Sequence, residues 1–174
     1  MLTQLLSPDE CDAMASRYDE EDGFRSRVVM ARHGFGRGEY RYFTYPLPPL
    51  VQDLRAALYP YLAPIANGWH ACMGRDDRFP PDHAAFLDRC HAAGQPRPTL
   101  LLLRYRAGDY NRLHQDLYGE HVFPLQMAVL LSRPDKDFDG GEFVTEQRPR
   151  MQSRADIVPL RQGDAVIFAV NEGR

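Results

Sequence analysis

Lysine is almost absent from this chain, and three features that mark large classes of protein are absent as well. Lys136 is the single lysine, so nearly all positive charge is carried by arginine. No apolar run approaches the roughly 20 residues that a membrane-spanning helix needs. The N-terminus turns acidic at once and has no basic segment typical of a secretory signal. The three cysteines form no C-x-x-C pair, which argues against a disulfide framework or a zinc site. We therefore expect a cytoplasmic protein with reduced thiols.

The length and composition indicate one globular domain over residues 1–174. Hydrophobic residues make up 44% of the chain and charged residues 26%, which is enough apolar material for a buried core. The formal net charge is −3, which argues against strong nonspecific binding to nucleic acid.

Charge is distributed unevenly near the N-terminus. Residues 9–22 contain seven acids and one arginine, whereas residues 25–41 contain five arginines and one acid, interleaved with Phe24, Phe35 and Tyr40. The ordinary interpretation is an acidic helix face beside a basic strand, both in contact with solvent. The functional interpretation is a basic, aromatic strip that contacts a polyanion.

The first half of the chain is predicted to be rich in helices. Ser7-Pro8-Asp9-Glu10 is a typical helix start, with a serine cap and a glutamate three residues later, and predicts a helix over about 8–18. Strands are expected at 24–32 and 39–45, joined by a glycine-rich turn. A second helix is expected from Pro48-Pro49, with a buried stripe at Leu50, Leu54, Leu58 and Leu62 and with Pro60 kinking or shortening it. A third helix follows a cap at Asp82.

The second half is predicted to be rich in strands. Strand-like runs separated by Gly, Pro and Asp occupy residues 99–105, 122–131, 142–146, 157–160 and 165–170. The fold class is therefore α+β, with helices packed on a sheet sandwich or open barrel. Residues 1–98 would form a helical and β support region, and residues 99–174 would form the β core.

The densest group of chemically active side chains surrounds His114 and Asp116. On an extended chain, positions two apart project to the same face, so an imidazole and a carboxylate can hold one metal ion. With a second histidine they would form the two-histidine, one-carboxylate triad of non-haem iron sites. With six histidines and sixteen aspartates in the chain, roughly 0.5 H-x-D matches are expected by chance alone. The surrounding sequence therefore has to support the assignment.

Three segments supply that support. The runs LRYRAGDYNRLHQD (103–116), GGEF (140–143) and GDAVIF (163–168) are each a turn next to a strand-like run. In this order and spacing they resemble the 2-oxoglutarate- and iron(II)-dependent dioxygenases, in the branch shared by prolyl hydroxylases and small bacterial oxygenases. The resemblance covers about residues 99–170.

The resemblance implies a double-stranded β-helix, or jelly-roll, core covered by the N-terminal helices. It implies that His114 and Asp116 ligate Fe(II) and that Tyr105 binds a carboxylate of the co-substrate 2-oxoglutarate, with Tyr110 as a second candidate. Dioxygen would be the oxidant.

The segments FRSRVVMARHGFGRGEYRYF (24–43) and RPRMQSRA (148–155) are similar to a bacterial group of nucleic-acid oxygenases. Arg148 and Arg150 are therefore candidate substrate contacts, because arginine forks suit phosphate groups. The substrate implied is an alkylated nucleic-acid base, which the arginines favour, or a protein side chain such as proline.

The chain departs from the family pattern at its end. The family has a distal histidine and an Arg or Lys for 2-oxoglutarate beyond the GDAVIF strand, where only residues 171–174 follow. His121 is the last histidine and a poor candidate for the third ligand. We expect the last jelly-roll strands to be missing through truncation, although a partner chain could supply them.

Two alternatives to an active oxygenase remain. The chain could be a jelly-roll binding module without a working iron centre, and the missing histidine favours this. A cupin-type metal domain would need more histidines on the strands than the sequence contains.

Overall fold

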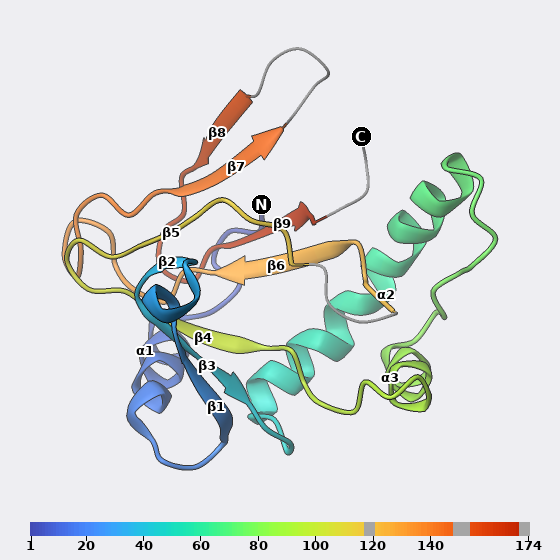
Figure 1. The fold of residues 1–174 in the computed structure, drawn as a ribbon, viewed down its shortest axis with the longest axis horizontal. Coiled ribbons are helices and arrows are strands. Elements are labelled where there is room, and N and C mark those ends of the chain that lie inside the picture. The colour runs from blue at the N-terminus through green and yellow to red at the C-terminus, as the bar shows by residue number, and fades with distance from the viewer. Residues whose placement is uncertain (117–120, 148–153, 171–174) are drawn as a thin grey trace.

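The computed structural model describes residues 1–116, 121–147 and 154–170. Helices and small antiparallel sheets alternate along these residues, as Figure 1 shows. Among the helices described, none is long and apolar enough to cross a bilayer. The expectation of a mixed helix-and-sheet protein is confirmed.

The N-terminal segment packs against the last strand of the chain. Helix α1 (Pro8–Ser16) starts at the predicted serine cap, where Ser7 and Glu10 form a reciprocal capping box. A short 3₁₀ helix, η1 (Arg17–Asp19), continues it. Before α1, Leu2 bridges Ala165, so the two ends of the described chain lie together.

A three-stranded antiparallel sheet crosses from the first half of the chain into the second. Its order is β1 (Phe24–Val29), β3 (Glu39–Phe43) and β4 (Leu101–Arg104). The predicted strand at 24–32 ends early, because the chain turns into the 3₁₀ helix η2 (Met30–His33). Since β4 pairs with β3, the expected support region and β core share this sheet.

The sheet carries a network of charged side chains. Glu39 accepts hydrogen bonds from both Arg27 and Arg104, and Arg104 also pairs with Asp19 at 2.5 Å. Burial raises the pKa of Glu39, but the two guanidinium groups outweigh it, so the pKa is lowered overall. These two arginines are therefore already paired within the protein.

Two helices form one of the two apolar clusters in the described part of the molecule. Helix α2 (Pro49–Cys72) runs through Pro60 and Pro64, so the prediction that Pro60 would shorten it is wrong. The predicted leucine stripe is only partly buried. Fully buried positions are instead Tyr59, Ala63, Ala66 and His70, because this face meets the aromatic side chains of Phe79, Phe86 and Phe123. Helix α3 (His83–Ala92) begins at the predicted Asp82 cap.

The remaining sheets of the described residues are three two-stranded pairs, and all their strands but β2 lie in the second half of the chain. Strand β2 (Gly36–Arg37) pairs with β5 (Tyr110–Asn111), β6 (Leu125–Val129) with β9 (Ala165–Ala169), and β7 (Phe143–Gln147) with β8 (Arg154–Val158). None of the sheets in the described residues closes on itself, so the jelly-roll topology stays a prediction. The hairpin β7–β8 projects from the rest of the protein (Figure 1).

Candidate metal centre

Strand β5 leads directly into the candidate site. Its residues Tyr110 and Asn111 pair with Arg37 and Gly36 of β2, and the Arg112 N–H donates to the Phe35 carbonyl at 2.9 Å. A Cβ on Gly36 would lie 2.2 Å from the Tyr110 carbonyl oxygen, so only glycine permits this pairing. The loop before β2 therefore positions the segment before His114.

The structure brings His114 and Asp116 together. The His114 Nε2 lies 3.4 Å from the Asp116 Oδ1, and both side chains are partly exposed. Residues 112–116 belong to no helix or strand, so the pair lies on an irregular segment after β5. The His114 and Asp116 side chains are brought together by the local contacts that each of them makes.

Each member of the pair is held by a second contact on its far side. The His114 Nδ1 lies 2.7 Å from the Arg112 carbonyl oxygen, and the Asp116 Oδ2 accepts a hydrogen bond from the Gln126 amide of β6 at 3.0 Å. A carbonyl only accepts, so Nδ1 carries the proton, and in the neutral ring Nε2 presents its lone pair toward Asp116. This outer support is the arrangement that orients metal-ligating histidines.

The donor chemistry of this pair fits two of the three protein ligands of a non-haem iron site. One imidazole nitrogen and one carboxylate oxygen face the same point. In the described part of the chain, no third His, Cys, Asp or Glu joins them. Two donors hold a divalent ion less tightly than three, so the pair alone forms a partial site.

The predicted co-substrate residues flank the same segment. Tyr105 follows β4 and hydrogen-bonds the Asn111 side chain; burial of its phenol raises the pKa, and the Asn111 bond offsets part of this rise. The phenol is therefore a neutral donor at physiological pH. Its ring packs against the backbone of Gly38. Tyr110 lies in β5 with 48% of its surface exposed.

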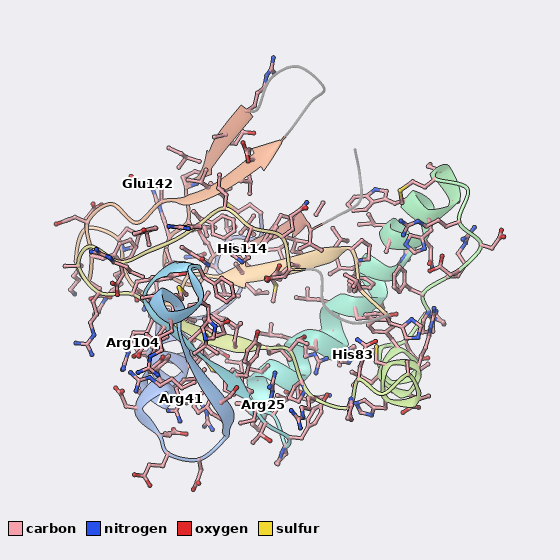
Figure 2. All side chains as sticks on the ribbon, in the orientation of Figure 1. Arg25, Arg41, His83, Arg104, His114 and Glu142 are labelled. Atoms are coloured by element: carbon pink, nitrogen blue, oxygen red, sulfur yellow. The ribbon has the colours of Figure 1, made fainter. Side chains whose placement is uncertain are left out.

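The other predicted residues are placed elsewhere or are not described. The backbone N–H of His121 donates to Gln95, and its Nδ1 lies 3.4 Å from Arg89 of α3, so the structure does not bring His121 to the pair. Arg148 and Arg150 lie outside the described residues. Figure 2 shows His83 near α3, well away from His114 in that view.

Sequence reasoning missed two contributors to the site. Gln126 holds the Asp116 carboxylate from β6, and nothing in its strand-like surroundings marks it in the sequence. The loop around Phe35 lies about 80 positions before His114 in the sequence. It positions the segment before His114 through the β2–β5 pairing and the hydrogen bond from Arg112 to Phe35. Gly36 was the one available signal, because closely spaced glycines often mark a tight backbone approach.

Comparison with known proteins shows the family to which the chain belongs. Residues 38–174 match a family described as "Oxygenase, catalysing oxidative methylation of damaged DNA". The chain belongs to this oxygenase family. No solved structure matches the chain.

Similar curated proteins include two uncharacterized proteins of Mycobacterium tuberculosis, one from strain H37Rv and one from strain CDC 1551. Each is 49% identical to this chain over 131 residues, which is 75% of this chain and 56% of the relative. The chain therefore spans about half the length of the curated relatives it matches.

Proposed function

We propose that this chain is the iron-binding part of a 2-oxoglutarate-dependent dioxygenase that oxidises methyl groups on damaged DNA bases. Family membership supports an oxygenase acting on damaged DNA. The observation that carries the iron assignment is the distance of 3.4 Å between the His114 Nε2 and the Asp116 Oδ1. The other polar atom of each side chain is hydrogen-bonded, to the Arg112 carbonyl and to the Gln126 amide respectively.

In this proposal His114 and Asp116 would hold Fe(II), and Tyr105 would hold 2-oxoglutarate. The bound iron and co-substrate would supply the net conversion of a methyl group, dioxygen and 2-oxoglutarate into a hydroxymethyl group, succinate and carbon dioxide. A hydroxymethyl group on a base nitrogen then leaves as formaldehyde, which is an oxidative demethylation.

The residues of this chain have separate tasks in that proposal. The Arg112 carbonyl retains the proton on the His114 Nδ1, which keeps Nε2 free as a donor. Gln126 keeps one oxygen of Asp116 occupied, so the other oxygen faces the metal position. The neutral Tyr105 phenol accepts a hydrogen bond from the Asn111 side chain and would use its own O–H to donate to a carboxylate oxygen of the co-substrate.

Anaerobic addition of Fe(II) and 2-oxoglutarate tests the proposal directly. We expect a weak visible metal-to-ligand charge-transfer band in the parent chain and its loss in His114→Ala and in Asp116→Ala. His91→Ala is the matched control, because His91 is also exposed and its ring packs against the Tyr45 ring rather than near the pair. Retention of the band in His114→Ala would rule out this iron site.

A second candidate function is a binding module without catalysis. It is favoured by one observation, the absence of a third donor beside the pair among the described residues. If neither iron nor 2-oxoglutarate binds the parent chain in equilibrium dialysis, this second function replaces the first.

A further inference from the structure

The surface that adjoins the candidate metal centre is both basic and aromatic. It is formed by the loop over residues 30–38 and by the segment that precedes His114, which β2 and β5 hold side by side (Figure 1). We call it the basic aromatic edge, and it comprises Arg32, His33, Phe35, Arg37, Tyr110 and Arg112.

Three aromatic rings of the edge face solvent. Phe35 is 43% exposed and Tyr110 is 48% exposed, and His33 is exposed as well. The rings of His33 and Phe35 stack with their centroids 5.4 Å apart and their planes 22° apart. They therefore form an offset two-ring stack, and another planar ring can add to its outer face.

The arginines of the edge have no ion pair with any described residue. Arg32, Arg37 and Arg112 are exposed, and none has a carboxylate partner in the part of the chain that the structure describes. Residues 30–38 and 110–115 contain no acidic residue. By contrast, Arg27, Arg104 and Arg133 each pair with a carboxylate. The edge is thus a local positive surface on a protein whose net charge is −3.

One residue links the edge to the metal pair. The backbone N–H of Arg112 donates to Phe35, and its carbonyl accepts from the His114 ring. Arg112 is two residues before His114 in the chain, so a ligand bound at this end of the edge lies next to the metal pair. The hollow of about 390 Å³ beside Arg25 and Arg97 is also basic, but no described contact ties it to His114.

We propose that the basic aromatic edge binds a single strand of nucleic acid next to the metal centre. Unpaired bases stack on Phe35 with His33 and on Tyr110, and Arg32, Arg37 and Arg112 contact the phosphates. Stacking of this kind requires an exposed base face, which a duplex hides between its neighbouring base pairs. The inference rests on the proposed function for its substrate class, damaged DNA, and adds the form of the strand and the residues that hold it.

Fluorescence anisotropy with a labelled, unmethylated single-stranded oligodeoxynucleotide tests this edge without iron or 2-oxoglutarate. We expect Phe35→Ala to weaken binding about tenfold, because stacking on one aromatic residue contributes on the order of 1–3 kcal/mol. Phe35→Trp keeps the stacking surface and should bind at least as tightly as the parent. Arg37→Gln should lower the slope of log affinity against log salt by about 0.7, the value for one contact to a single strand.

Two variants serve as matched controls. Tyr61→Ala removes an aromatic ring that is 74% exposed on α2, and Arg97→Gln removes an exposed arginine beside the separate hollow. Both should bind the oligonucleotide like the parent, and thermal melting of every variant checks that the fold is intact. Equal losses in the controls and in the edge variants would overturn the proposal, because they would indicate diffuse charge attraction.

The remaining outcomes separate this inference from the proposed function. No binding by the parent, or parental binding by Phe35→Ala and Arg37→Gln, overturns the edge whatever the iron titration shows. Binding of a matched duplex as tightly as the single strand also overturns it. Binding that depends on Phe35 and Arg37 supports the edge, even if no charge-transfer band forms and the iron proposal fails.

Discussion

Two histidines show how surroundings determine the chemistry of one residue type. His114 is half exposed and has one ring nitrogen tied to a carbonyl, so the other remains available as a donor. His83 is 8% exposed at the start of α3 and packs against Tyr59. Burial and the nearby Arg55 guanidinium lower the pKa of His83 to about 4. His83 is therefore neutral and structural at physiological pH.

The pKa of His83 predicts how stability depends on pH. The unfolded chain binds a proton at a pKa of about 6.5, but the folded protein does so only near 4, so stability is lost as pH falls through this range. From pH 7 to pH 5 this residue should cost the parent about 2 kcal/mol of unfolding free energy. In urea titrations His83→Gln should lose correspondingly less than the parent. Equal losses in both proteins would contradict the assignment, since the carboxylates are common to both.

At the scale of elements, the turn before β9 depends on a close backbone approach. Gly163 has φ +83°, and a Cβ there would lie 2.1 Å from the Leu6 carbonyl oxygen. Next in the chain, the buried Asp164 accepts hydrogen bonds from the backbone N–H groups of Gln4 and Arg161, which lower its pKa. The N-terminal segment is thus docked on this turn through backbone contacts.

Gly163→Ala should therefore be more destabilising than the same change at Gly108. Gly108 has φ +81°, but a Cβ there has no neighbour within 4 Å, so Gly108→Ala should cost only about 1 kcal/mol for the left-handed backbone. Gly163→Ala adds a clash with Leu6 and should cost at least about 2 kcal/mol more. Chemical denaturation of both variants measures the difference, and equal costs would show that the N-terminal segment is not docked as described.

At the scale of the whole molecule, the candidate chemistry lies apart from the apolar centres. One buried cluster surrounds Tyr59 of α2, and another surrounds Phe43 of β3. The His114–Asp116 pair lies outside both clusters and is fixed mainly by polar contacts. Function and stability should therefore respond to different substitutions.

That separation predicts the stability of the site variants. His114→Ala and Asp116→Ala should unfold within about 0.5 kcal/mol of the parent, because both side chains are partly exposed. Tyr59→Ala, in contrast, should cost about 3–5 kcal/mol through the cavity it leaves. Large destabilisation by either site substitution would show that the pair is structural, and thermal melts of the three variants provide the comparison.

Local patterns in the sequence were sufficient for most helix starts and for the pair itself. Ser7 and Asp82 cap the helices that follow them, since capping depends on residues only a few positions apart. His114 and Asp116 were recognisable by their spacing within a family-like segment, and the structure places them on an irregular segment after β5. The leucine stripe also failed as a guide to the core of α2, because burial depends on which face α3 and Phe123 cover.

The sequence by itself determined the capped helices and the two neighbouring donors, because each depends on interactions within a few residues. Only the tertiary structure decided that Gln126 holds Asp116 and that the loop containing Phe35 adjoins His114. Those contacts join segments far apart in the chain, and they form only where strand pairing and packing bring the segments together.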